Sequence, residues 1–171
     1  CFQNQSKKIK NIFTSVLKGH IAVARVNLNK KKTGKLIDIE ARRFLKKNNL
    51  DYNHGTGHGV GFFLNVHEGP QAISKQNSVK IQSGMILSNE PGYYKQGKFG
   101  IRIENLIYAL KVGKKLIFKN LTLVPIEKDM INFKLLTKKE RDYIFKYHIE
   151  VYSKLSPFLS KKEKKWLASF I

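Results

Sequence analysis

Apolar and polar positions divide the chain into a helical beginning, an extended middle and a helical end. Over residues 7–27, apolar side chains recur mostly every three or four positions with lysines between them, and this spacing predicts a helix. A second helix is predicted to start at Asp38, acting as its cap, and to run through Leu45 to an end at Asn48-Asn49.

The middle of the chain is too rich in glycine for helices. Six glycines fall between Gly55 and Gly84, together with Pro70. Short strands fit this stretch better, and four segments are apolar enough to form them. They are residues 60–66, 85–89, 101–110 and 116–125, the last as a strand or an extended passage.

The C-terminal part returns to helical spacing. Thr137 and Glu140 match a capping box, and the helix that it opens is predicted to run through Leu155 because Pro157 ends it. A short helix is predicted over residues 161–170. Helices followed by strands and then by helices indicate an α+β fold.

Composition narrows the class of protein. The 171 residues suit one domain, and 42% hydrophobic residues are enough for a core. No apolar run approaches the roughly 18–20 residues of a membrane span, so no membrane partner is expected. The single cysteine, Cys1, excludes an internal disulfide framework and indicates a reducing, cytoplasmic compartment. A first residue other than Met suggests a piece of a longer protein.

The formal charge of +21 is concentrated in the two flanks. Residues 1–53 carry 13 basic and 3 acidic side chains and residues 110–171 carry 15 and 6, whereas residues 54–109 carry 5 and 3. Basic flanks are typical of nucleic-acid binding. We favour composition bias instead, because 28 of the 33 basic residues are Lys and only 5 are Arg. Proteins that recognise phosphates and bases specifically use Arg more than Lys. A nucleic-acid partner is therefore not expected.

Two histidines in a glycine-rich segment are the first candidates for chemistry. His54 and His58 lie four positions apart in residues 54–61, a spacing that would suit a zinc site on a helix. Four glycines in these eight residues argue against a helix and predict an extended or tightly turned backbone. His58 is then either a metal ligand or a hydrogen-bonded core residue next to the predicted strand 60–66.

Two further segments place charges where a core strand should be apolar. Glu90 ends the predicted strand 85–89, where a carboxylate is costly unless it is paired, bound to metal or exposed in a turn. Alternation places Arg102 and Glu104 on one face of the next strand. These two form an ion pair or share a solvated face, or Glu104 is a metal ligand with Arg102 as its partner.

Together these segments offer one imidazole and two carboxylates on neighbouring strands: His58, Glu90 and Glu104. An oxygen-rich set of this kind suits a divalent metal such as manganese, cobalt or zinc. Carboxylates that bridge two ions can generate a hydroxide nucleophile. His67, nine residues after His58, is a candidate proton donor or carbonyl partner.

Three long motifs follow one another at residues 54–70, 89–94 and 100–105. Together they closely resemble the motifs of aminopeptidase P (Xaa-Pro aminopeptidase), one of the pita-bread metallopeptidases, to which methionine aminopeptidase and prolidase also belong. Residues 16–22, residues 121–126 and the C-terminal helix are similar too, so the likeness covers nearly the whole chain in order.

The resemblance implies a partial pita-bread fold with antiparallel strands and flanking helices, and it implies a metal site. His58, Glu90 and Glu104 match metal ligands, and Glu90 also matches the carboxylate that helps to activate the attacking water. Two divalent ions, most commonly manganese with zinc or cobalt as alternatives, would polarise the carbonyl group and supply hydroxide. The implied reaction removes the N-terminal residue from a peptide whose second residue is proline.

The resemblance also implies a substrate pocket. His54 and His67 match histidines that shape this pocket and stabilise the developing tetrahedral charge. The resemblance therefore implies that His54, His67 and Glu90 are the catalytic residues. Arg102 and Tyr94 match positions in the pocket or directly behind the ligands.

The sequence departs from the family's pattern at two further ligands. The family's two-metal site also uses two aspartates before the stretch aligned with residue 1, and Asp38 and Asp51 lie in the wrong context to replace them. We therefore expect residues 1–125 to be the C-terminal half of a catalytic domain and residues 126–171 its helical extension. We expect the chain alone to be inactive and poorly soluble, with exposed sheet edges. Family relatives are often dimers, so a homodimer of the complete protein is one alternative.

Two other interpretations stay open. A non-catalytic pita-bread protein that binds RNA or ribosomes would account for the basic surface, but it would have no chemical reason to keep His58, Glu90 and Glu104. Prolidase, which cleaves dipeptides, is the alternative within the enzyme class. The context of residues 65–70 and the C-terminal extension resemble aminopeptidase P more closely.

Overall fold

Residues 5–171 are described by a computed structural model, so Cys1, on which the argument for a reducing compartment rests, lies outside the described residues. The helices are α1 (Lys7–Ala24), α2 (Gly34–Lys46), α3 (Lys138–Leu155) and α4 (Lys161–Ala168). The chain forms two compact units. One comprises residues 15–122, and the other comprises residues 123–171 together with the N-terminal residues up to Thr14.

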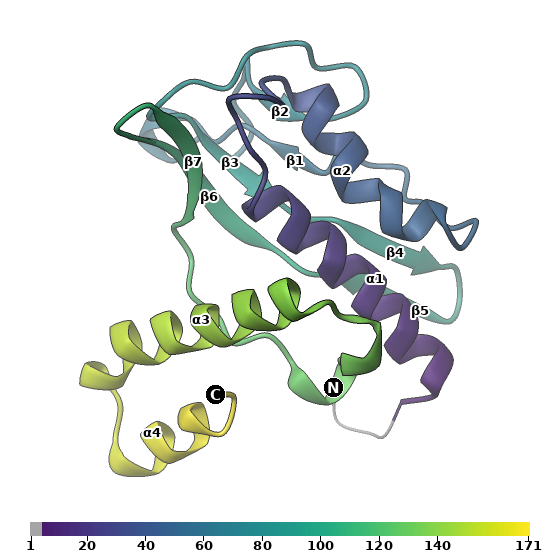
Figure 1. The fold of residues 1–171 in the computed structure, drawn as a ribbon, viewed down its shortest axis with the longest axis vertical. Coiled ribbons are helices and arrows are strands. Elements are labelled where there is room, and N and C mark those ends of the chain that lie inside the picture. Colours follow the sequence, from purple (N-terminus) through teal and green to yellow (C-terminus); the bar gives the residue numbers. More distant parts are fainter. Residues whose placement is uncertain (1–4) are drawn as a thin grey trace. The chain divides into compact units, whose positions relative to one another are not determined.

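The strands lie in the first unit and pair antiparallel throughout. β1 (Gly57–His58) pairs with β2 (Ala72–Ile73), and β4 (Gly92–Lys95) pairs with β5 (Phe99–Arg102). β6 (Asn105–Val112) lies between β3 (Ile86–Asn89) and β7 (Lys115–Asn120). A bridge between Gly59 and Leu87 joins β1 to β3. Figure 1 shows α2 and the C-terminal part of α1 along one face of these strands.

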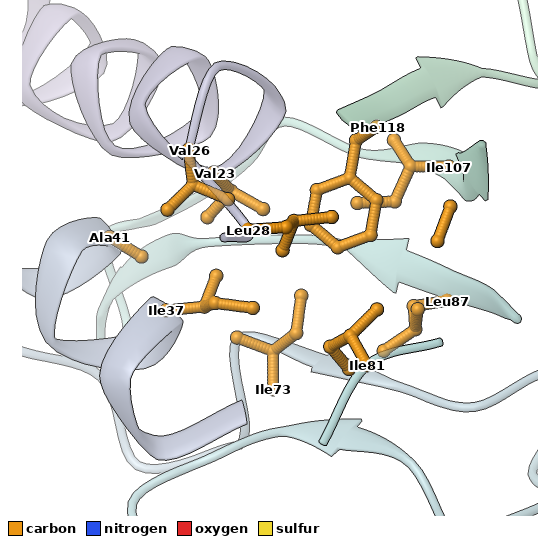
Figure 2. Packing of buried hydrophobic residues seen from close by; sticks show 11 residues of the cluster. Val23, Val26, Leu28, Ile37, Ala41, Ile73, Ile81, Leu87, Ile107 and Phe118 are labelled. Atoms are coloured by element: carbon orange, nitrogen blue, oxygen red, sulfur yellow. The ribbon is translucent and has the colours of Figure 1, made fainter. Parts of the chain in front are cut away.

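The core of this unit lies between the two helices and the strands. Its buried side chains come from the end of α1 and the residues that follow it, from α2, from the strands and from the loop before β3, and they converge in Figure 2. They are Val23, Val26, Leu28, Ile37, Ala41, Ile73, Ile81, Leu87, Ile107, Ala109 and Phe118. Full burial of one such aliphatic side chain stabilises the fold by about 1.5–3 kcal/mol, so this contact fixes which face of the strands meets the helices.

Alternation along β3 and β6 then decides where the polar side chains lie. Leu87 and Ile107 belong to the core on the helix side. Because side chains alternate between the two faces of a strand, Asn89 and Asn105 also face the helices, and Ser88 faces away from them. The last residue pair of this ladder is Asn89 opposite Asn105. Glu90 directly follows Asn89, and Glu104 directly precedes Asn105. Both glutamates are thereby placed on the face that the helices do not cover.

The second unit is built on two helices with complete caps. Thr137 and Glu140 at α3, like Ser160 and Glu163 at α4, exchange side chain to backbone hydrogen bonds in a capping box. The predicted capping box and the helix to Leu155 are thus confirmed. No helix among residues 5–171 is long and apolar enough to span a bilayer.

Two polar side chains of α3 hydrogen-bond to residues 124–126, in the segment between β7 and α3 that contains no strand. The Tyr147 hydroxyl donates to the carbonyl of Val124 at 2.7 Å. The Ile126 amide donates to Nε2 of the buried His148 at 3.0 Å. These bonds give the extended backbone of residues 124–126 the partners that a strand ladder would otherwise provide.

The helix predictions need three corrections. The helix predicted over residues 7–27 ends at Ala24. Asp38 is not a cap, because α2 starts at Gly34 and has Thr33 at its N-cap position. Asp38 instead lies inside the helix with its carboxylate buried, accepting hydrogen bonds from Arg42 and Thr56. The last predicted helix, 161–170, ends two residues early at Ala168.

The strand predicted over residues 60–66 is wrong. The amide of Gly61 donates to the carbonyl of Asn65 at 2.8 Å, which closes a turn and leaves no straight run to pair with a neighbour. Phe62 and Phe63 lie in a 3₁₀ turn, and each is 89% exposed. His58 therefore belongs to a strand itself and does not lead into one.

The other strand predictions hold with changed bounds. Residues 85–89 form β3 as Ile86–Asn89, and 116–125 is a strand only over Lys115–Asn120. The strand predicted over 101–110 is two strands, because β5 pairs with β4 whereas β6 pairs with β3. The chain changes partners at residues 103–104, and this break brings Glu104 to the end of the β3–β6 ladder.

Candidate metal centre

His58 lies where two stretches of backbone pass unusually close together. A Cβ atom on Gly57 would lie 2.0 Å from the carbonyl oxygen of Ser88, and one on Gly59 would lie 2.0 Å from that of Glu68. Only glycine fits on either side of His58. The glycine-rich motif therefore serves close approach of β1 to β3, and it sets the His58 backbone directly beside Ser88, whose hydroxyl accepts from its amide at 2.9 Å.

The hydrogen bond at one ring nitrogen of His58 determines the role of the other. Nδ1 lies 3.0 Å from the carbonyl oxygen of Gly59, which can only accept, so Nδ1 carries the proton of the neutral ring. Nε2 is then left with its lone pair, 3.5 Å from Oε1 of Glu90. This is the tautomer in which a histidine binds a metal through Nε2.

Glu90 is the most enclosed carboxylate of the site, only 9% exposed. The Ser88 hydroxyl donates to its Oε1 at 3.0 Å, and Nη1 of Arg102 lies 3.3 Å from its Oε2. Its own amide donates to the carbonyl of Thr56 at 2.8 Å. The exposed-turn interpretation of Glu90 is thus excluded, and Arg102 pairs with Glu90 across the turn.

Glu104 completes a cluster of three potential ligands. One ligand atom each from His58, Glu90 and Glu104 lie within 4.8 Å of one another. One imidazole nitrogen and two carboxylates suit a divalent ion such as zinc, manganese or cobalt. Of the ligands that the sequence suggested, the fold brings together all three, from positions that lie 32 and 14 residues apart in the chain.

A second row of polar side chains runs from Glu90 to His54. Nε of Arg102 donates to the Tyr94 hydroxyl at 2.7 Å, and this hydrogen bond raises the pKa of the Arg102 guanidinium. The Tyr94 oxygen lies 2.9 Å from Nε2 of His54, whose Nδ1 faces the carbonyl of Gly55 at 2.7 Å. Nδ1 is therefore the donor, and the tyrosine hydroxyl donates to Nε2. Arg102, Tyr94 and His54 form one oriented chain of hydrogen bonds.

His67 lies beside the cluster on the loop that follows β1. Its ring centroid is 4.2 Å from that of His58, and its side chain is exposed. Because His67 is exposed and adjacent to a candidate ligand, a molecule bound at the site could contact the imidazole rings of both His58 and His67.

A buried arginine supports the segment that carries His54. Arg42 donates to Oδ2 of Asp38 and to Oδ1 of Asp51, each at 2.7 Å. It also donates to the carbonyls of Tyr52 at 2.7 Å and of His54 at 2.6 Å. Four acceptors around one guanidinium anchor residues 51–54 to α2.

Charge pairing shifts the pKa values of Arg42 and of its partner Asp51. Burial acts to raise the pKa of Asp51, but the hydrogen bond from Arg42 and its positive charge outweigh burial and lower the pKa below its ordinary value. Burial likewise acts to lower the pKa of Arg42, and hydrogen bonds to Asp38 and Asp51 raise it overall.

Sequence reasoning missed three residues that shape the site: Ser88, Arg42 and Asp38. The signal for the Asp38–Arg42 pair was their spacing of four on a helix, which places the two side chains on one face. The signal for Ser88 was the run of polar residues 88–90 at the end of an apolar strand.

The comparisons with known proteins bear on this cluster. The sequence profile of Metallopeptidase family M24 matches residues 1–110, and that of the C-terminal region of peptidase M24 matches residues 114–169. The chain belongs to metallopeptidase family M24. The three clustered side chains thus lie in a chain of a metal-dependent peptidase family.

Among M24 relatives, a probable Xaa-Pro aminopeptidase P of Coprinopsis cinerea is 47% identical over 168 residues. The alignment covers 91% of this chain and 27% of that protein. Xaa-Pro aminopeptidase 1 of Dictyostelium discoideum is 45% identical over 172 residues, which cover 93% of this chain and 27% of that protein. The chain thus spans little more than a quarter of the length of these relatives.

Solved structures agree with the M24 assignment. The X-prolyl aminopeptidase of Caenorhabditis elegans, described as a cytosolic enzyme with a di-nuclear active site, matches with a TM-score of 0.90 at 38% identity. The match covers 98% of this chain and 29% of that chain. Prolidase from Pyrococcus furiosus matches with a TM-score of 0.61 at 28% identity over 70% of this chain and 34% of its own. The α+β pita-bread fold class predicted from the sequence is confirmed.

Proposed function

We propose that the protein carrying this chain is an Xaa-Pro aminopeptidase, which hydrolyses the bond between the N-terminal residue of a peptide and a proline in second position. The observation that carries this proposal is the cluster of His58, Glu90 and Glu104 within a chain 45–47% identical to relatives named for that activity. The retained ligand set and these names count against an RNA-binding or ribosome-binding protein.

We propose two divalent ions, with manganese as the metal and His58, Glu90 and Glu104 among the ligands. When bound, such ions supply a hydroxide nucleophile near neutral pH and polarise the scissile carbonyl. The two aspartates that the resemblance implies for the rest of the ligand set have no counterpart in the cluster within residues 5–171. The 171-residue chain alone is therefore proposed to be inactive.

Around this centre the side chains of the chain take distinct roles. Glu90, fixed by Ser88 and Arg102, holds the proton that the attacking water loses. His67, exposed beside His58, donates a hydrogen bond to the substrate carbonyl as negative charge develops on it. His54 lines the pocket, in an orientation set by Tyr94 and Arg102.

We further propose a cytoplasmic protein in which residues 1–125 form part of the catalytic domain and residues 126–171 a helical extension. The support for the compartment is the relative described as cytosolic. A homodimer of the complete protein is a further proposal, and its solution mass would test it.

The decisive experiment uses the complete protein, stripped with a chelator and reloaded with manganese, zinc or cobalt. Tripeptides with proline in second position should release their first residue, and matched tripeptides with alanine there should not. Release from Xaa-Pro dipeptides alone would identify a prolidase instead. No metal-dependent release from any of these peptides would contradict the proposal.

A further inference from the structure

Residues 154–171 combine positive charge with exposed aromatic rings, and the proposed reaction uses none of them. They carry five lysines and one glutamate, a net side-chain charge of +4, and no arginine. The glutamate, Glu163, is part of the capping box of α4, where its carboxylate accepts from the amide of Ser160 at 2.8 Å. Within the described residues no lysine of α4 forms an ion pair, so these charges are not neutralised by carboxylates.

Contacts with α3 determine which side of α4 faces inward. Leu167 is only 3% exposed. The ring of Phe170, just beyond the helix, lies 5.9 Å from that of the buried His148 and 5.2 Å from that of Trp166. Figure 1 shows α4, in yellow, beside α3. One side of α4 therefore packs on α3, and the other side faces water.

The outer side of α4 joins lysines to an aromatic ring. Because residues four positions apart lie on the same side of a helix, Lys161 lies next to Lys165, and Lys162 lies next to Trp166. All four side chains are exposed, Trp166 to 57%. Phe158, in the 3₁₀ turn just before the helix, is 86% exposed. We call these five residues the lysine–aromatic surface.

The composition of this surface matches a particular kind of partner. Tryptophan is enriched at membrane–water interfaces, and helices that lie on membranes combine lysines with Trp or Phe. Clusters of four or more lysines bind anionic lipid headgroups. Protein interfaces, by contrast, are depleted in Lys and enriched in Arg, and nucleic-acid recognition also prefers Arg. Five lysines without an arginine, beside two exposed rings, therefore favour a lipid surface.

We propose that the lysine–aromatic surface is a reversible docking site for anionic lipid bilayers. The rings of Phe158 and Trp166 enter the headgroup region, and the lysine ammonium groups lie over the anionic headgroups. The expectation of no membrane partner was based on the lack of a spanning segment, which binding of this kind does not need. The cytoplasmic leaflet carries anionic lipids and is the surface open to a cytoplasmic protein. The inference does not depend on the proposed peptidase activity.

The test measures how the complete protein sediments with lipid vesicles. The reference vesicle is phosphatidylcholine alone, and the probe is the same vesicle with about 30% phosphatidylserine. At about 0.1 M salt we expect the partition coefficient to be roughly a hundredfold or more higher for the anionic vesicle. The difference should vanish at about 1 M salt, where the Debye length falls to about 3 Å.

Two variants separate the charges from the aromatic contact. Lys162→Gln with Lys165→Gln removes two charges and should lower the partition coefficient roughly thirtyfold. Phe158→Ser removes an exposed ring and should lower it roughly tenfold. The matched control is Lys114→Gln with Lys115→Gln, the same charge change at exposed lysines of the β6–β7 hairpin. It should lower the partition coefficient by less than about threefold, because these lysines lie outside the proposed surface.

Three outcomes would overturn the inference: equal binding to both vesicles, an equal loss in the hairpin pair, or unchanged binding in Phe158→Ser. A complete protein that binds single-stranded RNA but neither vesicle would also overturn it, in favour of a nucleic acid. Release of the first residue from soluble Xaa-Pro tripeptides should be unchanged in every variant. Failure of the proposed function and failure of lipid docking would therefore appear in separate assays.

Discussion

At the scale of single residues, the candidate site depends on charges that are enclosed and paired. Glu90 receives a hydrogen bond from Ser88 at one oxygen and the charge of Arg102 at the other. Its role in the proposed reaction requires a negative charge at this place, because both metal binding and proton uptake need a carboxylate.

Glu90→Gln should therefore abolish most of the activity of the complete protein. The amide keeps the size of the side chain but removes the charge, and we expect kcat to fall by roughly a thousandfold or more. Peptide release under saturating metal measures it. Glu150→Gln, the same change at an exposed position of α3, should leave kcat unchanged. A mild loss in Glu90→Gln would exclude Glu90 as the group that activates water.

Arg42 and Arg43 are adjacent residues with opposite surroundings, and together they give a test of stability. The Arg42 side chain is 3% exposed and serves four acceptors, whereas that of Arg43 is 54% exposed and pairs with Glu40 at 3.2 Å. Arg42→Met leaves Asp38 buried without its cation, and we expect a loss of about 3–5 kcal/mol in the free energy of unfolding. Arg43→Met should cost less than about 1 kcal/mol. Denaturant titration measures both, and equal losses would contradict the anchoring role of Arg42.

At the scale of elements, helices were easier to predict than strands. A helix such as α3 is determined by its own sequence, since its capping box and apolar spacing lie within one segment. The strand predicted over 60–66 failed because a short apolar run between glycines does not reveal whether a partner strand lies beside it. The break at residues 103–104 was hidden for the same reason, because β5 and β6 pair with different strands.

The candidate ligands could nevertheless be predicted, since their residue types are costly at strand ends whatever the exact bounds. Their mutual distances could not, because these depend on close backbone contacts such as that of Gly57 with Ser88. The helical spacing of Asp38 and Arg42 indicates their pairing, but it does not show that Arg42 also binds the segment 51–54.

The capping box of α3 provides a prediction at this scale. Thr137→Ala removes the oxygen that accepts from the Glu140 amide, and we expect a loss of about 1 kcal/mol together with faster amide exchange in the first turn of α3. Lys138→Ala changes the next residue, whose side chain is exposed, and it should alter neither stability nor turnover. Unchanged exchange in Thr137→Ala would show that the cap contributes little.

At the scale of the whole molecule, burial of neutral histidine makes stability depend on pH. Burial lowers the pKa of His148 below its ordinary value of 6.5. As the pH falls below 6.5, His148 takes up a proton in the unfolded chain before it does so in the folded chain. The contribution of neutral His148 to the free energy of unfolding is therefore complete above about pH 6.5 and is lost progressively below it.

The amide of Ile126 reports this loss directly, because it donates to Nε2 of His148. Between pH 7.5 and pH 5.5 its protection factor, corrected for the intrinsic exchange rate, should fall by up to about tenfold. The amide of Val124 donates to the Tyr147 hydroxyl instead of to a histidine, and it should keep its protection. Parallel behaviour of the two amides would contradict the assignment.

The proposed ligand set, drawn from β1, the turn after β3 and the residue before β6, has a consequence for assembly. Residues 58 and 104 meet only after the long-range strand pairs have formed, so an unfolded chain has no site to offer the ion. Binding then adds its free energy to the folded state alone, about 2.7 kcal/mol at a metal concentration one hundred times the dissociation constant. In the proposed metalloenzyme, metal supply thereby becomes a determinant of how long the folded protein survives, and not only of how fast it works.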